Sequence, residues 1–281
     1  MNDKSGVFML EIFISLVVIV GMVIALVFNT RYRQHPWDSF YPKLAWMRAS
    51  MYFCFCWTLS YLSGGLEMML TSPVVTQEQL QNVNWWIYTC CAAVFIVLAY
   101  SILWCYYTPV FKRKKNILVS ALFGFLWGSS SGQLFLSIWL LVGTFGLSTI
   151  WVGIVTFAIL AMYQPNWHNI YWDHYIAPEH DTPMTQVIKA TCCHMPNLLI
   201  MLPYLSYYEN YALFVGAQVI ACVSAGLGMR YPSPWAEPSK LNYAHRTAAR
   251  LPRCTGYIVD DYKSDPYTPF YRGWTGPEMH S

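Results

Sequence analysis

The sequence predicts an all-α integral membrane protein, built as a bundle of seven transmembrane helices. The 281-residue chain is 56% hydrophobic and only 11% charged, whereas soluble globular domains carry about 25% charged residues. It also contains several apolar runs of roughly 20 residues, the length that a helix needs to cross about 30 Å of hydrocarbon. These observations exclude an ordinary soluble domain. They indicate the lipid bilayer as a partner, and nothing in the sequence supports a nucleic-acid partner.

The individual spans follow from hydropathy and helix breakers. We expect the first to be retained rather than cleaved as a signal peptide, because it is long, lacks a small-residue cleavage site and precedes Arg31 and Arg33. The fourth and fifth form one apolar run, which we divide at Gly143–Gly146 because a single helix would be too long. The predicted spans are about 7–29, 44–71, 84–107, 117–142, 146–163, 185–207 and 209–229. They form one transmembrane domain, 1–229, followed by a loosely ordered tail, 230–281, rich in Pro, Tyr and charge.

The orientation of the spans follows from the basic residues in the short loops. The first loop carries Arg31, Arg33 and Lys43, and the third carries the basic run 112–115. The second and fourth loops have no basic residue, while the tail is rich in Arg. This pattern predicts an N-terminus outside the cell or in the lumen and a cytosolic C-terminus. In a fungal cell the expected compartment is the endoplasmic reticulum. The fifth loop, 164–184, then faces the cytosol.

The fifth loop holds the densest group of chemically active residues. Three histidines and three acids fall within the 14 residues 168–181, interleaved with Trp and Tyr. A carboxyl group under aromatic side chains has its charged form desolvated, which raises its pKa and suits it to proton donation. Aromatic faces also stabilise carbocations, by about 0.5–2 kcal/mol per ring. The predicted catalytic residues are Asp173, Glu179, His180 and Asp181, and the predicted aromatic substrate contacts are Trp167, Trp172 and Tyr175.

Polar residues inside the spans form a second group of candidates, because such residues are costly in a bilayer. In the second span, Cys56, Ser60, Ser63 and Gly64 share one helical face with Glu67. That small, polar stripe packs on another helix or lines a cavity. Glu67 is therefore an independent catalytic candidate, on the opposite side of the membrane from the fifth loop.

The fourth and sixth spans contribute predicted substrate contacts. The segment 128–133 reads Gly-Ser-Ser-Ser-Gly-Gln inside an apolar helix. It serves either interhelical hydrogen bonding or a polar cavity wall, to which Gln133 belongs. Near the start of the sixth span, Lys189 offsets the charge of the loop acids, and His194 lies close by along the same helix. Both are expected to contact the substrate.

Two other readings of the fifth loop stay open at this point. Imidazole and carboxylate together suit copper, iron or zinc, but the loop has no recognised short ligand spacing. The histidine boxes of the di-iron membrane desaturases are absent from the sequence. We therefore expect no metal and no cofactor. Alternatively, the loop has no chemistry, and its aromatic side chains lie among lipid headgroups while its charges pair with basic residues.

The chain resembles the membrane-bound terpene cyclases of fungal meroterpenoid pathways, including the ascofuranone-type group. The resemblance depends on the seven-span architecture, on Trp172-Asp173 and 178–181 (Pro-Glu-His-Asp) in the loop, and on Glu67 near the end of the second span. It implies protonation of a terminal epoxide or olefin on a prenylated substrate, a cascade of cationic intermediates and a final deprotonation. It implies neither a metal nor a diphosphate.

Two alternatives belong to other classes. The segment 161–167 (Ala-Met-Tyr-Gln-Pro-Asn-Trp) resembles a helix end in the seven-span subunit of copper membrane monooxygenases. The Thr-Gly-Thr-Pro-Glu-Tyr stretch of that subunit is missing, which places this alternative second. A small-molecule transporter or binding protein, with Lys189 and Glu67 as substrate or proton contacts, comes third because the sequence shows no inverted repeat.

Overall fold

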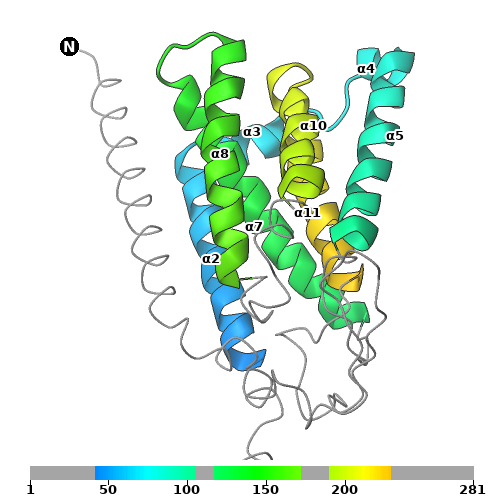
Figure 1. Cartoon of the computed structure of the whole chain (residues 1–281). Coiled ribbons are helices and arrows are strands. Elements are labelled where there is room, and N and C mark those ends of the chain that lie inside the picture. The colour runs from blue at the N-terminus through cyan, green and yellow to red at the C-terminus, as the bar shows by residue number, and fades with distance from the viewer. Residues whose placement is uncertain (1–41, 105–116, 172–189, 229–281) are drawn as a thin grey trace, which may run out of the picture.

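The computed structural model describes residues 42–104, 117–171 and 190–228, excluding the side chains of 42–45, 47–48 and 164–171. This described part is all-α, with eight α-helices and two π-helical turns (Figure 1). The elements are α2 (Pro42–Leu62), α3 (Gly65–Thr71), α4 (Gln77–Gln81), α5 (Val83–Leu98), η3 (Ala99–Leu103), α7 (Ile117–Gly143), α8 (Thr149–Tyr171), η4 (Ala190–His194), α10 (Met195–Ser206) and α11 (Tyr211–Gly228). The predicted first span, 7–29, and the tail, 230–281, lie outside the described residues.

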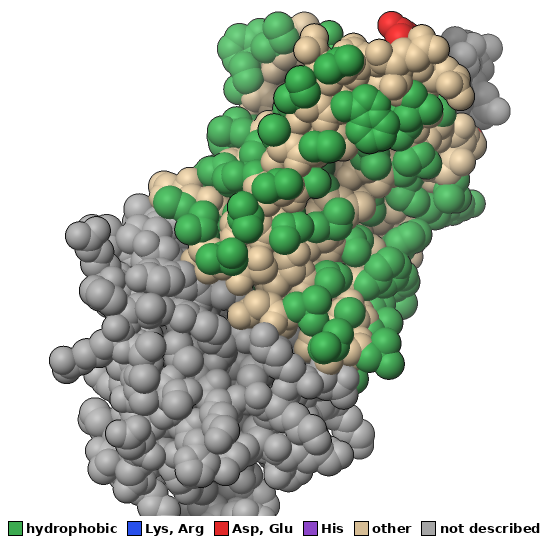
Figure 2. Space-filling view, turned by 90° about the vertical axis from the view of Figure 1, so that its right-hand side faces the viewer, with side chains coloured by type: hydrophobic (Ala, Val, Ile, Leu, Met, Phe, Trp, Pro, Cys, Tyr) green, Lys and Arg blue, Asp and Glu red, His purple; other side chains and the backbone are tan. Residues whose placement is uncertain are grey.

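Three helical stretches in the described part have the length and composition to cross a membrane. They are Val83–Leu103, Ile117–Gly143 and Tyr211–Gly228. On the face shown in Figure 2, apolar side chains cover the described helices along their length, and acidic atoms appear at one end. A soluble fold would bury such side chains or interrupt them with charge. The chain is therefore a multi-pass membrane protein.

The division of the long apolar run is confirmed. α7 ends at Gly143 and α8 begins at Thr149, so a short turn separates the two helices. Gly146 has a φ of 69°, in the left-handed region that glycine adopts without steric cost. The Thr144 hydroxyl donates a hydrogen bond of 2.6 Å to the Leu141 carbonyl oxygen and satisfies one of the last acceptors of α7.

Two predicted boundaries are wrong. The second span is not one helix over 44–71, because Gly64 adopts a φ of 78° and separates α2 from α3. A left-handed residue cannot continue a right-handed helix, so the chain changes direction there. The fifth loop also starts later than position 164, because α8 continues to Tyr171 despite Pro165. A proline removes one backbone hydrogen bond, which bends a helix without always ending it.

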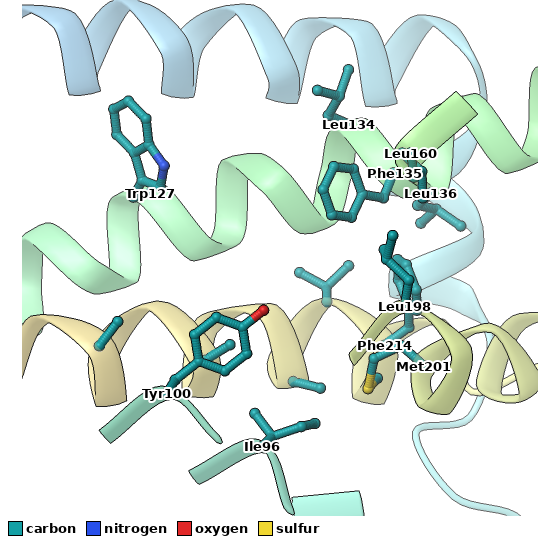
Figure 3. Packing of buried hydrophobic residues seen from close by; sticks show 14 of the residues in the cluster. Ile96, Tyr100, Trp127, Leu134, Phe135, Leu136, Leu160, Leu198, Met201 and Phe214 are labelled. Carbon is teal, nitrogen blue, oxygen red and sulfur yellow. The ribbon is translucent and has the colours of Figure 1, made fainter. Parts of the chain in front are cut away.

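The core forms around α7, which packs against both α2 and α11. Gly124, Gly128 and Gly132 recur every four residues and line the contact with α11. A Cβ atom at Gly128 would lie 2.6 Å from the Gln218 carbonyl oxygen and from the Val219 Cα, so the two backbones touch. Small residues at this spacing are a common device for close helix crossings in membranes. Figure 3 shows the apolar side chains that fill the space beside this crossing, including Leu134, Phe135, Leu198, Met201 and Phe214.

Candidate functional site

The predicted site residues divide into those that the structure describes and those that it does not. Glu67, Gln133 and His194 are described. Trp167 lies on α8, but its side chain is not among those described. The remaining predicted residues lie outside the described part, namely Trp172, Asp173, Tyr175, Glu179, His180, Asp181 and Lys189. Their roles stay predictions.

Glu67 does not share a continuous helical face with the small polar residues of α2. It lies in the first turn of α3, after the break at Gly64, and its side chain is exposed. Ser60 and Cys56, in contrast, are fully buried within the bundle. The predicted stripe is therefore wrong beyond Gly64, because the helix break changes the direction in which later side chains project. A catalytic role for Glu67 stays a prediction.

Gln133 is buried, and both ends of its amide have partners. The Ser60 hydroxyl donates to Gln133 Oε1 over 2.5 Å, and Gln133 Nε2 donates to the Met69 sulfur over 3.1 Å. Gln133 thus connects α7 to α2 and α3. Nearby, Ser130 donates 2.6 Å to the Leu126 carbonyl oxygen of its own helix. These contacts favour the packing interpretation of 128–133, and a contact of Gln133 with substrate stays a prediction.

His194 belongs to a group of four buried polar residues that we call the polar cluster: Tyr100, His194, Asn197 and Gln218. His194 Nδ1 lies 3.2 Å from the Tyr100 hydroxyl. Asn197 Nδ2 donates to the Tyr100 hydroxyl over 3.2 Å and to Gln218 Oε1 over 3.4 Å. The exposed fraction of each side chain is 4% or less. Three helical stretches, η3, the continuous η4–α10 and α11, therefore meet through polar atoms deep inside an apolar bundle.

Both π-helical turns of the described part contribute to the polar cluster. η3 carries Tyr100 and η4 ends at His194. π-turns are rare and frequently occur at functional sites, because the wider turn changes the direction of nearby side chains. The position of η4 has a local cause, since Pro196 follows it and has no N–H to donate to the preceding turn. The wider backbone there directs His194 toward Tyr100, and their ring centroids lie 5.9 Å apart.

A second group, which we call the aromatic cluster, lies where α2, α7 and α8 meet. It comprises Trp46, Tyr52, Phe123, Trp127 and Tyr163. The Tyr52 hydroxyl lies 3.2 Å from the Tyr163 hydroxyl and 3.5 Å from the Ser131 hydroxyl. The Tyr52 and Trp127 rings are 4.9 Å apart, and Trp127 stacks on Phe123 at 5.9 Å. Trp46 meets Phe123 edge-on at 5.2 Å. The group brings together five aromatic rings and two phenol hydroxyls.

Sequence reasoning missed most of these residues. Gln218 is the one carboxamide in α11, and a polar amide in an apolar span is a signal that could have identified it. Tyr100, Tyr52 and Tyr163 had no local signal, because the chain contains 21 tyrosines and many lie in apolar stretches. Only the packing of the helices brings these side chains together.

Comparison with known proteins identifies no relative: no family model, no curated protein and no solved structure matches the chain. Among the described residues, no group of three or more His, Cys, Asp or Glu side chains could hold a metal ion. The fold and the two clusters therefore define the protein as a multi-pass, all-α membrane protein with a polar and an aromatic group in its interior.

Proposed function

We propose that the protein is a membrane-embedded terpene cyclase. It takes a lipophilic prenylated substrate, in its simplest form an epoxide, from the bilayer and converts it to a cyclic isomer. The donated proton opens the terminal C–O bond or adds to an alkene, and the alkene π electrons then form the ring bonds. Loss of one proton from the last cation restores neutrality, so the product has the mass of the substrate.

The proposed topology has seven spans, with an external or luminal N-terminus and a cytosolic C-terminus. In Figure 1, the described helices α2, α5, α7, α8, α10 and α11 run alternately in opposite directions along one bundle. A span before α2 gives an odd number of spans, as the distribution of basic residues requires. The fifth loop is then cytosolic and connects the ends of α8 and η4.

The aromatic cluster is the observation that carries the proposal. Its rings lie in the half of the bundle where α2 and α7 begin, with Trp46 and Phe123 in the opening turns of these helices. Tyr163 lies eight residues before the end of α8, so the fifth loop leaves the bundle from the same half. An acid in that loop would thus act beside ring faces that stabilise a developing cation, by about 0.5–2 kcal/mol each.

The position of Glu67 favours the loop acids as the proton donors. Glu67 is exposed, and α3 lies toward the end of the bundle opposite the start of α2 (Figure 1). The loop acids, in contrast, precede η4 along the sequence, and Lys189 precedes His194 by only five residues. We assign proton donation to Asp173, Glu179 and Asp181 with His180, and substrate contacts to the loop aromatics, Gln133, Lys189 and His194.

The test is a product analysis with microsomes that contain the full-length protein and an epoxyfarnesylated aromatic compound. The expected product is a cyclised isomer of unchanged mass. Asp173→Asn and Glu179→Gln should each lower its formation at least about tenfold, since a proton donor contributes about 10²–10⁴-fold. The matched control is Glu78→Gln, an exposed acid on α4 that should leave turnover unchanged. Activity that survives both loop substitutions refutes the loop assignment, and an oxygenated product indicates a monooxygenase instead.

A further inference from the structure

The polar cluster contains two buried atoms whose hydrogen-bonding capacity is unused. Among the described residues, Asn197 Oδ1 and Gln218 Nε2 are buried and have no hydrogen-bond partner. The exposed fraction is 0% for Asn197 and 2% for Gln218. A buried polar atom without a partner destabilises the folded state, because it has lost its hydrogen bonds to water. Two such atoms on two touching amides indicate a missing group rather than an isolated packing defect.

The unused pair consists of one acceptor and one donor. Asn197 Nδ2 already donates to Gln218 Oε1 over 3.4 Å, which leaves Asn197 Oδ1 as an acceptor and Gln218 Nε2 as a donor. Turning both amides by 180° exchanges these roles but again leaves one donor and one acceptor. The complementary chemical group therefore both donates and accepts a hydrogen bond. A hydroxyl group does so with a single oxygen atom.

The surroundings of the pair favour a neutral ligand with an apolar body. The described neighbours in the polar cluster are a phenol, an imidazole and two amides, and none of them carries a fixed charge. An ionised group buried there would lose its hydration without a fixed counter-charge from these four side chains. The buried core around them is apolar and includes Ile96, Leu198 and Met201 (Figure 3).

The π-helical turns provide a second, independent observation. η3 and η4 pack against each other, and each contributes one residue to the polar cluster. A π-turn is less stable than regular α-helix and is retained mostly where a site requires its geometry. Both π-turns of the described part occur at this one place.

We propose that Asn197 and Gln218 bind the neutral hydroxyl group of an apolar molecule between η3, η4, α10 and α11. The hydroxyl hydrogen binds the free amide oxygen, and the hydroxyl oxygen accepts from the free amide N–H. The Tyr100 hydroxyl, which lies against His194, accepts from Asn197, and Asn197 in turn donates to Gln218. This site requires binding only, so it extends beyond the proposed cyclisation. An ordered water molecule has the same hydrogen-bonding chemistry and is the alternative that the experiment must exclude.

The test is photolabelling of the full-length protein in lipid nanodiscs by a farnesol analogue that carries a diazirine and an alkyne. Labelling should be saturable, and farnesol should displace the probe. Farnesyl methyl ether, which has the same apolar chain but no hydroxyl hydrogen, should compete about tenfold less well, as expected for loss of one buried hydrogen bond. Because this comparison uses the unaltered chain, it does not depend on the folding of a variant.

Gln218→Met then removes one of the two amides at nearly constant shape. We expect displacement by farnesol to require about tenfold more competitor in this variant. The matched control is Thr156→Val on α8. This change removes another buried hydroxyl that has no hydrogen-bond partner, and it should leave displacement unchanged. Size-exclusion chromatography checks that each variant is folded.

Equal competition by the ether and the alcohol refutes the proposal, as does displacement that is unaffected by Gln218→Met in a folded variant. Labelling that never saturates indicates that the amides hold only water, and it overturns the proposal as well. Alcohol-selective labelling of a chain that turns over no substrate supports this site and refutes the cyclase. Cyclisation without such labelling refutes this site alone.

Discussion

Replacement of Gly128 by alanine should destabilise the bundle, because α7 and α11 touch through their backbones at this position. The added methyl group would lie 2.6 Å from the Gln218 carbonyl oxygen and from the Val219 Cα. Both are backbone atoms, so no rotation of a side chain relieves the overlap. To reach the 3.4 Å at which ordinary van der Waals contact begins, the two helices must separate or tilt.

The magnitude follows from overpacking. Forcing an extra methyl group into a filled contact costs about 1–3 kcal/mol, and the backbone location places Gly128→Ala toward the upper part of that range. Alanine also has a higher helix propensity than glycine, by about 1 kcal/mol. This gain stabilises the folded and the unfolded state almost equally, because the helices of a membrane protein persist when the bundle comes apart. At Gly124 and Gly132 the nearest backbone atoms are 2.8 Å and 2.9 Å away, so alanine there should cost less than at Gly128.

The assay is the free energy of unfolding of the purified protein in mixed micelles, titrated with a denaturing detergent. Gly216→Ala is the matched control, since it lies on α11 with nothing within 4 Å of its added methyl group. It should change the free energy of unfolding by less than about 0.5 kcal/mol. The reasoning fails if Gly128→Ala is as stable as the unaltered chain, or if Gly216→Ala destabilises it equally.

Three further substitutions test other contacts. Tyr100→Phe removes the hydroxyl between His194 and Asn197. It should lower the free energy of unfolding, measured in the same micelles, by about 1–3 kcal/mol. An unchanged free energy of unfolding would contradict the hydrogen bonds of the polar cluster. Asn210→Ala removes two hydrogen bonds to the 72–82 connection, at Val74 and Gln79, and one to Trp85 at the start of α5. Hydrogen exchange in the connection should therefore rise at least about tenfold, whereas unchanged exchange would exclude this role. The methyl group added by Gly64→Ala meets no atom within 4 Å. The free energy of unfolding should therefore fall only by the cost of a left-handed alanine, about 1–2 kcal/mol. A larger fall would indicate a contact that the structure does not show.

Where the prediction succeeded, the signal was local in sequence. The apolar runs identified the helices, and Gly143 and Gly146 marked a break because glycine leaves a helix without steric cost. The same kind of signal at Gly64 divides the predicted second span into two helices. The predicted helical face that joins Glu67 to Cys56 and Ser60 is therefore interrupted.

The polar cluster shows why the candidate site was only partly predictable. His194 was a candidate from its place near the start of the sixth span, but its partner Tyr100 lies 94 residues away along the chain. A tyrosine in an apolar helix has the same sequence signature whether its hydroxyl meets lipid headgroups or a buried imidazole. The pairing depends on how α10 and α11 rotate against η3, and nothing in the local sequence sets that rotation.

The sequence by itself determined that this is an all-α, multi-pass membrane protein, because the length and apolarity of a helix in lipid follow from the hydrogen bonds of its own backbone. It also pointed to the acid-rich fifth loop. The tertiary structure alone decided which polar side chains meet. Close packing of α7 on α11 through three glycines brings Gln218 into the interior beside Asn197, and there the two amides satisfy each other only in part. Such contacts arise between distant segments, whose relative positions are fixed by packing and not by local composition.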